Sequence, residues 1–177
     1  SVSCCSIHPM LPFSNKFSSY EQLNKAFFTV EGQDAAVEAI SGLFCSIGNE
    51  VCHIDGAKKA KYHAAASILS NQVIAVLDMG YSLLEDCGFT RAEAVRATGQ
   101  LVMRNIENVL EAGCDGALTG PIERNDIETV KKHIACMQND DSDDVRLYKM
   151  LGTKLVNIAE KKNPDKDYTQ MMELLRG

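Results

Sequence analysis

The stretch from Lys58 to Cys87, KKAKYHAAASILSNQVIAVLDMGYSLLEDC, decides the fold of this chain. It contains no proline, and its only glycine is Gly80. Such a run predicts one helix of roughly 45 Å, longer than most helices of globular proteins. Beyond its first turns the run is too apolar to be exposed, so we expect the rest of the chain to be organised around it.

The start of this predicted helix carries a polar stripe. At about 100° per residue, Lys59, His63 and Ser70 share one face with Ala66, and Asn71 lies about 80° from His63. The stripe is either a catalytic face or a solvated helix end beside an alanine-rich helix contact. Lys59 alone could be a surface lysine at a helix end, and His63 alone could be a core histidine bonded to a backbone carbonyl.

The residues around the long helix predict a chain that is mostly α. Strands are predicted at residues 2–7, 26–30 and 50–54, and a helix at 33–47, which is too few strands to close a sheet alone. The predicted helices after the long one lie at residues 91–112, 127–137, 145–161 and 168–175. We therefore expect a short N-terminal α/β region, residues 1–55, followed by an all-helical bundle, residues 56–177.

Several short signals predict where these elements end. His8-Pro9-Met10 is predicted to break the first strand, and Gly48 and Gly113 to end the helices before them. The acidic segment 139–144 lacks the glycine and distal glutamate of a calcium loop, and its last residues are predicted to cap the next helix. Three capping boxes are predicted, at Ser18 with Glu21, Thr90 with Glu93 and Asn125 with Glu128.

Composition narrows the classes of function. The 177 residues carry a net charge of -6 and form no lysine or arginine stripe, so a nucleic-acid partner is not expected. Seven scattered cysteines without a C-x-x-C predict reduced thiols, most of them packed as small hydrophobes, in a cytoplasmic protein. The histidine spacing predicts no metal site, and no apolar run reaches membrane length, so no membrane partner is expected.

Four motifs follow one another along the chain: His8-Pro9-Met10, Phe28-Thr-Val-Glu31-Gly32, Lys59-x-x-Tyr62-His63-Ala-Ala-Ala with Asn71, and Ala117-Leu-Thr-Gly-Pro121 with Arg124. This set resembles the C-terminal part of a bacterial family of Rossmann-like, NADP-dependent oxidoreductases whose helical domain is of unknown function. The wider superfamily includes 6-phosphogluconate dehydrogenase. The resemblance implies that residues 1–55 end a Rossmann-like domain. It also implies that the helical part is a 6-phosphogluconate dehydrogenase C-terminal-like bundle that forms a homodimer.

The resemblance also implies a set of site residues. Enzymes of the superfamily begin their central helix with Lys-x-x-Asn-Asn, in which the lysine is the acid/base partner of the substrate oxygen. Lys59 takes the lysine position, and Tyr62 and His63 replace the two asparagines. The implied catalytic residues are Lys59 and His63, the implied cofactor-binding residues are His8, Pro9 and Met10, and the implied substrate-binding residues are Tyr62, Ser70, Asn71, Thr119, Gly120 and Arg124.

Residue chemistry is consistent with these roles, and simpler interpretations remain beside them. Reducing a carbonyl with a nicotinamide hydride requires a proton donor within hydrogen-bond reach of the developing alkoxide, which a lysine can be. Tyr62 could instead be an aromatic packing residue, and Thr119-Gly120-Pro121 a tight connection between helices.

The Gly-rich loop G-x-G-x-x-G that binds dinucleotide phosphates does not occur in the sequence. We therefore expect the chain to be a C-terminal piece that uses NADP through a Rossmann domain outside it and is inactive alone. Three hypotheses remain at this point. The first is an oxidoreductase acting on a small carbonyl or hydroxy substrate, the second is a non-catalytic helical dimerisation or sensor module, and the third is a thiol protein using Cys4-Cys5.

Overall fold

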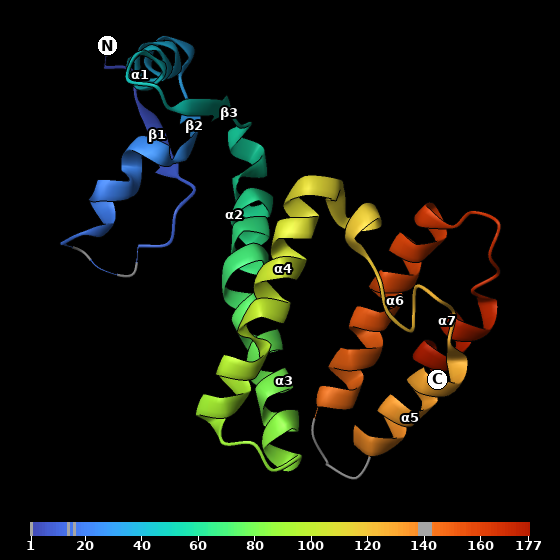
Figure 1. Ribbon diagram of the computed structural model, residues 1–177. Coiled ribbons are helices and arrows are strands. Elements are labelled where there is room, and N and C mark those ends of the chain that lie inside the picture. Colours follow the sequence, from blue (N-terminus) through green and yellow to red (C-terminus); the bar gives the residue numbers. More distant parts are fainter. Residues whose placement is uncertain (1, 14, 16, 138–142) are drawn as a thin grey trace. The chain divides into compact units, whose positions relative to one another are not determined.

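The structure is a computed structural model that describes residues 2–13, 15, 17–137 and 143–177. The chain divides into two compact units, Ser1–Asp78 and Met79–Gly177, called here the N-terminal and C-terminal units. The expected fold class is confirmed, because the chain is mostly helical, with a small three-stranded sheet followed by a helical bundle (Figure 1). The expected domain boundary after residue 55 stays a prediction.

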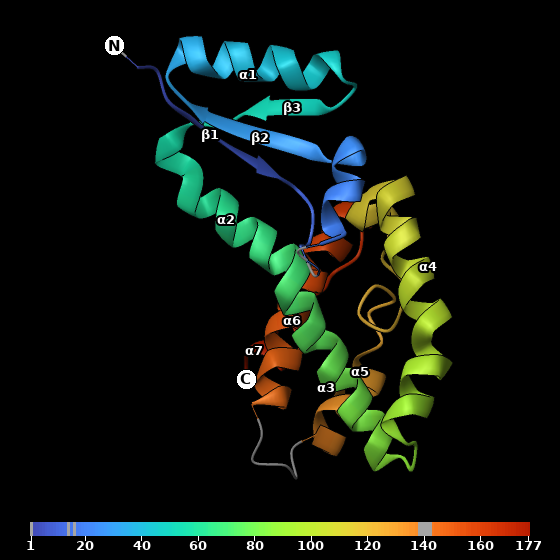
Figure 2. The ribbon, with the colours of Figure 1, turned by 90° about the vertical axis from the view of Figure 1, so that its left-hand side faces the viewer.

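The N-terminal unit is built on a mixed sheet in the order β1-β2-β3. Strand β1 (Cys5–Pro9) runs antiparallel to β2 (Phe27–Gly32), which runs parallel to β3 (Glu50–His53). Helix α1 (Asp34–Ser46) packs against β2 and β3 and covers one face of the sheet (Figure 2). A 3-10 helix, η1 (Ser19–Lys25), lies between β1 and β2 in the chain.

A small core holds this unit together. Phe28 and Val30 of β2 are buried, and the Phe28 ring lies 4.4 Å from that of Phe44 in α1, measured between centroids. The buried Asn49 donates from Nδ2 to the carbonyl oxygens of Leu23 and Ala26, at 2.7 and 3.1 Å. A side-chain amide thus satisfies backbone groups where η1 meets β2.

The start of the N-terminal unit differs from the sequence-based expectation. The predicted first strand forms, but at Cys5–Pro9, and it is mostly exposed rather than buried. The predicted break at His8-Pro9 is wrong, because both residues lie inside the strand. Proline, which has no N–H to donate, is tolerated at the end of this strand, which is an edge of the described sheet. The predicted capping box at Ser18 is also wrong, since the Ser18 side chain makes no cap hydrogen bond.

The predicted long helix is confirmed as a continuous helical run that begins with a 3-10 turn and contains a π-helical turn. Asp55 caps its start, because Asp55 Oδ1 accepts from the Ala57 N–H at 3.0 Å. The run then consists of a 3-10 turn η2 (Gly56–Lys58), α2 (Lys59–Ser67), a π-helical turn η3 (Ile68–Gln72) and α3 (Val73–Asp86). Such π turns frequently occur at functional sites.

The apolar side chains of this run are not buried as expected. Ile68, Leu69 and Ile74 are 54%, 74% and 66% exposed in the described chain. By length and composition alone, the segment Gly56–Asp86 could also cross a membrane, and none of its apolar window is buried among the described residues. The expectation that no apolar run reaches membrane length is therefore wrong, although these criteria alone are weak evidence for a span.

The C-terminal unit consists of the end of α3 and the helices α4 (Arg91–Ala117), α5 (Ile127–Met137), α6 (Asp144–Lys162) and α7 (Thr169–Arg176). The capping box at Thr90 and Glu93 is confirmed by reciprocal hydrogen bonds between each side chain and the other residue's N–H. Gly113, with a φ of 73°, breaks the helix as predicted, and a further turn continues to Ala117. The core of this unit consists of Ile122, Val130, Ile134, Val156, Ala159, Tyr168, Met171 and Leu175.

Other expectations for the helix starts and the thiols are corrected by the structure. Asp126, not Asn125, caps α5, because Asp126 Oδ1 accepts from the Thr129 N–H at 3.0 Å. Asp143 makes no side-chain cap bond at the start of α6, and the preceding part of the predicted acidic loop, residues 139–142, lies outside the described residues. All seven cysteines are exposed in this chain, so the expectation that most pack as small hydrophobes is wrong.

Gly32 allows β1 to approach β2 where the two strands begin to pair. Its φ is 140°, and a Cβ there would lie 2.5 Å from the carbonyl oxygen of Cys4 and 2.6 Å from the Cα of Cys5. We predict that Gly32→Ala lowers the free energy of unfolding by at least about 2 kcal/mol, as measured by urea denaturation. Gly42→Ala is the control, since nothing lies within 4 Å of a Cβ at that helical position. We expect it to stabilise by about 0.5–1 kcal/mol, and an equal effect of both variants would contradict the role of Gly32.

Candidate functional site

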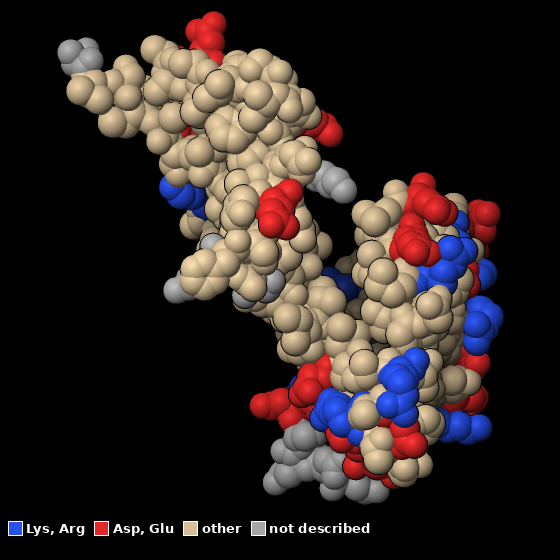
Figure 3. Space-filling view, turned by 60° about the vertical axis from the view of Figure 1, so that its left-hand side comes forward, with Lys and Arg blue, Asp and Glu red and all other residues tan. Residues whose placement is uncertain are grey.

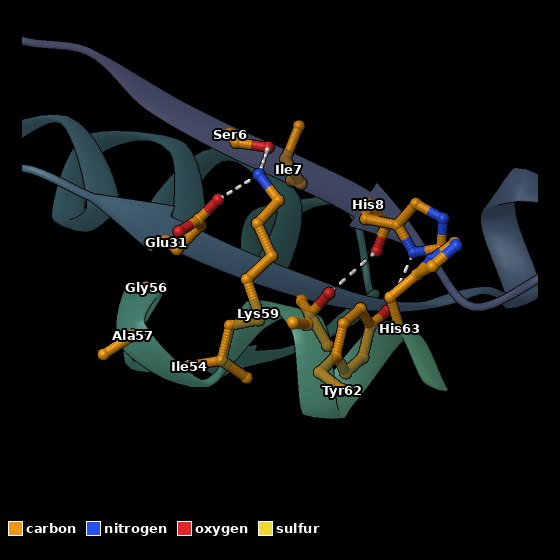
Figure 4. Close-up of a pocket in the computed structure, with 12 residues that line it drawn as sticks. Ser6, Ile7, His8, Glu31, Ile54, Gly56, Ala57, Lys59, Tyr62 and His63 are labelled. Atoms are coloured by element: carbon orange, nitrogen blue, oxygen red, sulfur yellow. Dashed lines mark hydrogen bonds and ion pairs between the residues drawn. The ribbon is translucent and has the colours of Figure 1, made fainter. Parts of the chain in front are cut away.

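A cavity of about 590 Å³ opens between β1, β2 and the first turns of α2 (Figure 4). This volume is within the usual range of small-molecule sites. Polar groups enter it from all three elements: Ser6 and His8 from β1, Thr29 and Glu31 from β2, and Lys59, Tyr62 and His63 from α2. Apolar side chains, among them Ile7 and Ile54, line the remainder.

Lys59 reaches from α2 to both strands. Its Nζ lies 3.5 Å from Ser6 Oγ and forms an ion pair with Glu31 Oε1 (Figure 4). The Glu31 side chain is 17% exposed and that of Lys59 is 57% exposed, so the carboxylate is the more enclosed partner. An ammonium group has three donors, and two are used in these contacts, which leaves one N–H available to a ligand.

Gly56 makes room for the carboxylate. A Cβ at Gly56 would lie 2.8 Å from Glu31 Oε2, so even an alanine there would push the Glu31 side chain aside. The glycine in the turn between β3 and α2 therefore leaves space for the Glu31 side chain, which pairs with Lys59.

A second polar contact joins β1 to α2. Tyr62 Oη lies 2.8 Å from His8 Nδ1 and donates to Met10 Sδ at 2.7 Å, and the two rings meet edge to face with centroids 5.8 Å apart. A hydroxyl has a single hydrogen, so donation to the sulfur requires His8 Nδ1 to carry the proton that Tyr62 accepts.

A second cavity, of about 530 Å³, adjoins the first at His8 and His63, which line both. Its apolar wall consists of Met10, Leu11, Pro12, Phe13, Ala66 and Leu69. Its polar wall contains Ser67, Ser70 and Asn71. Ser70 Oγ lies 2.8 Å from the Ala66 carbonyl oxygen and 2.9 Å from Asn71 Oδ1, so these polar groups interact with one another.

The structure brings most of the predicted N-terminal site residues together around these cavities. Lys59, Tyr62 and His63 line the first, and Met10, Ser70 and Asn71 line the second. Pro9 lines neither and pairs in β1 with Phe28 of β2. In Figure 4 Lys59 points toward Ser6 and Glu31, and His63 lies beside His8. The polar contacts of Lys59 therefore run to the strands rather than to His63, and the catalytic roles stay predictions.

Thr119, Gly120 and Arg124 belong to the C-terminal unit, where they form a compact turn. Gly120, with a φ of 102°, accepts from the Arg124 N–H at 3.0 Å, and Arg124 is exposed. The turn is anchored by Tyr168 Oη, which donates to the Glu123 carbonyl oxygen at 2.6 Å, and by Lys162 Nζ, which donates to that of Leu118. These bonds agree with a tight helix connection, and the substrate-binding roles stay predictions.

Ser6 and Glu31 are candidate functional residues to which the sequence analysis assigned no role, although Glu31 lies in one of the four motifs. Glu31 follows the buried residues Phe28, Thr29 and Val30 in β2, and a carboxylate at the end of a buried strand is a signal that could have identified it. No comparable signal existed for Ser6. Its position opposite Glu31 follows from the antiparallel register of β1 and β2, which the sequence does not specify.

The electrostatic character of the surface differs along the chain. On the face drawn in Figure 3, acidic and basic side chains are intermixed over the C-terminal unit and sparse over the N-terminal unit. Among the residues that the structure describes, no three His, Cys, Asp or Glu side chains are grouped so as to hold a metal ion.

Two solved structures have a similar fold. The first is the protein TM1727 from Thermotoga maritima, with a TM-score of 0.77 and 24% identity over 90% of this chain and 62% of that one. The second is titled "putative NADP oxidoreductase BF3122", from Bacteroides fragilis, with a TM-score of 0.67 and 20% identity over 85% of this chain and 56% of that one. These similarities define the fold that the chain shares with the two proteins.

The chain belongs to the family described as "Domain of unknown function (DUF2520)", which matches residues 26–155. This agrees with the expected helical domain of unknown function. No curated protein matches the chain. The chain spans less than two thirds of the length of the two solved structures.

The turn that contains Arg124 generates a prediction about pH. The hydrogen bond from Asn163 Nδ2 to Glu123 Oε1 lowers the pKa of Glu123 below its ordinary 4.5, and the positive charges of Lys166, Lys162 and Arg124 act in the same direction. A carboxyl group with a lowered pKa in the folded state stabilises it above the unfolded pKa, and this contribution is lost as the pH falls through the folded value.

We predict that Glu123→Gln flattens the loss of stability between pH 7 and about pH 3.5, measured as the shift of the urea midpoint. The control is Glu128→Gln, which removes an exposed carboxylate of α5 that pairs with Lys131. Equal pH profiles for Glu123→Gln and the unmodified protein would contradict the prediction.

Proposed function

We propose that this chain is the C-terminal part of an NADP-dependent oxidoreductase of the 6-phosphogluconate dehydrogenase superfamily, acting on a small carbonyl or hydroxy substrate. The sequence motifs, the family and the name of the B. fragilis protein support the assignment to the oxidoreductases. The observation that carries the proposal is the Lys59 ammonium group, held at the edge of a ligand-sized cavity with one donor left for a substrate oxygen.

In this proposal Lys59 is the acid/base group. A bound nicotinamide would supply or accept the hydride. Lys59 would donate a proton from Nζ to the oxygen of a carbonyl being reduced, then regain one from solvent, while Tyr62 or His63 orients that oxygen. Glu31 and Ser6 would hold the lysine in position for this transfer.

The residues of this chain would bind only part of the cofactor. His8, Pro9 and Met10 would contact the nicotinamide end, and the phosphates would be bound by a Rossmann domain, because the chain has no Gly-rich phosphate loop. We propose that the chain alone is inactive and that the protein is cytoplasmic and homodimeric through its helices.

The test uses the complete protein as its gene encodes it. We predict saturable binding of NADPH, measured by the change in nicotinamide fluorescence. We also predict NADPH oxidation with at least one of butanal, octanal and 2-oxobutanoate. Lys59→Met should leave the Kd for NADPH nearly unchanged and lower kcat by about 10²- to 10⁴-fold, the usual contribution of a general acid.

Lys61→Met is the matched control, because Lys61 lies on the same helix, is exposed and lines neither cavity. Its kcat should equal that of the unmodified protein. If NADPH does not bind the complete protein, or if the two lysine variants lose activity equally, the proposed function is wrong.

A second candidate function is a non-catalytic helical dimerisation or sensor module. The observation in its favour is an exposed apolar stripe on α4. Val95, Met103, Ile106, Val109 and Leu110 fall within about 120° of the helix circumference, and each is 38% to 81% exposed. An apolar face of this kind is typical of a surface covered by a second copy or another partner.

We predict that the protein is a dimer in light scattering after size exclusion and that Leu110→Asn shifts it toward monomer. Leu101→Asn is the control, because Leu101 is 64% exposed but lies off the stripe. A monomer at high concentration, or co-sedimentation with lipid vesicles in place of dimerisation, would contradict this prediction. A dimer that does not bind NADPH would favour the non-catalytic module over the oxidoreductase.

A further inference from the structure

The two adjoining cavities differ in chemical character, and together they define a class of ligand. The first contains the ion pair of Lys59 and Glu31 and the hydroxyl of Tyr62, whereas the second is lined mainly by apolar side chains. His8 and His63 line both, so a single elongated molecule could extend from one to the other past these imidazoles.

We propose that the two cavities bind one uncharged substrate, with its carbonyl or hydroxyl group at Lys59 and an apolar tail in the second cavity. The proposal rests on the proposed function for the choice of a carbonyl or hydroxyl head. Beyond the proposed function, it specifies that the ligand carries no charge and has an apolar tail.

Charge balance within the cavities supports an uncharged ligand. Lys59 and Glu31 are the only lysine, arginine, aspartate or glutamate side chains that line either cavity in the described chain, and they neutralise each other. A carboxylate or phosphate would have to lie beside the Glu31 carboxylate or displace it from Lys59. A neutral oxygen can accept a hydrogen bond from the remaining N–H of Lys59 without being repelled by Glu31 and without breaking the ion pair.

The composition of the second cavity supports the tail. Met10, Leu11, Pro12 and Phe13 follow β1 in an unbroken apolar run, and Leu69 of the π turn lines the same cavity. The Ser70 hydroxyl has the Ala66 carbonyl oxygen and Asn71 Oδ1 within reach as acceptors for its single hydrogen, so it does not require a polar ligand. A cavity of about 530 Å³ can hold a chain of several methylene groups.

The experiment measures direct binding to this chain, without cofactor. Butan-2-one, hexan-2-one, octan-2-one and octanoate are titrated, and the ring-proton resonances of the four histidines are followed by NMR. His8 and His63 should shift, whereas His53 and His133, which line neither cavity, should not. The affinity should rise at least about tenfold from butan-2-one to octan-2-one. Full burial of one methylene group strengthens binding about fourfold. The expected rise is smaller than four such steps, because Phe13, which lines the second cavity, is 55% exposed and the tail is therefore only partly buried.

Two variants test the two halves of the proposal. Phe13→Ser should weaken the binding of octan-2-one by about fivefold and leave the binding of butan-2-one unchanged. Phe17→Ser, which removes a 74% exposed phenylalanine outside both cavities, should change neither. Glu31→Gln leaves Lys59 without its counter-charge and should strengthen the binding of octanoate relative to that of octan-2-one by about tenfold.

The inference is wrong if affinity does not depend on chain length, if octanoate binds the unmodified chain as tightly as octan-2-one, or if the two phenylalanine variants behave alike. These outcomes are independent of the cofactor. Probe binding without NADPH binding by the complete protein would remove only the proposed oxidoreductase function. NADPH turnover without chain-length dependence would remove only the present inference.

Discussion

The contact between Lys59 and Glu31 is the interaction on which the N-terminal unit's candidate site depends. It joins the first turn of α2 to β2, and the hydrogen bond to Ser6 extends it to β1. Because the lysine is 57% exposed, water screens the pair, and its contribution to stability is at most about 1 kcal/mol. Its main consequence is geometric, since it holds an ammonium group at the wall of a cavity.

The same contact determines what the cavity can recognise. A lysine beside a carboxylate is a hydrogen-bond donor in a locally neutral environment rather than a free positive charge. Tyr62 and His8 extend this polar surface, because the Tyr62 hydroxyl contacts both an imidazole nitrogen and a thioether sulfur. The chemistry proposed for this site therefore depends on positioned donors more than on net charge.

Exposed apolar surface is the second feature of this chain. Side chains of the long helical run and of α4 that would normally be buried are open to solvent in the described chain. The buried clusters lie elsewhere, around Phe28 and Val30 in the N-terminal unit and around Val156 and Met171 in the C-terminal unit. Each unit thus has a core of its own, and the long helical run and α4 retain exposed apolar faces for other contacts.

Much of the secondary structure could be predicted from the sequence, because its signals are local. The absence of proline predicted the long helical run, the Thr90 and Glu93 pattern predicted a capping box, and Gly113 predicted a helix break. The errors occurred where a neighbouring strand or partner group decides the conformation. Pro9 continues β1 because β2 pairs with that strand, and Asp126 rather than Asn125 finds the free N–H at the start of α5.

The candidate site shows the same division. Helical periodicity placed Lys59 and His63 on one face of a helix, because that relation depends only on the spacing of residues along the chain. Only the tertiary structure paired Lys59 with Glu31 and Ser6, and Tyr62 with His8. These partners are separated by 28 to 54 positions in the sequence, and they meet because the register of β1 on β2 and the turn at Gly56 bring three elements to one cavity. Register and side-chain contact over such separations depend on packing, which local sequence patterns do not encode.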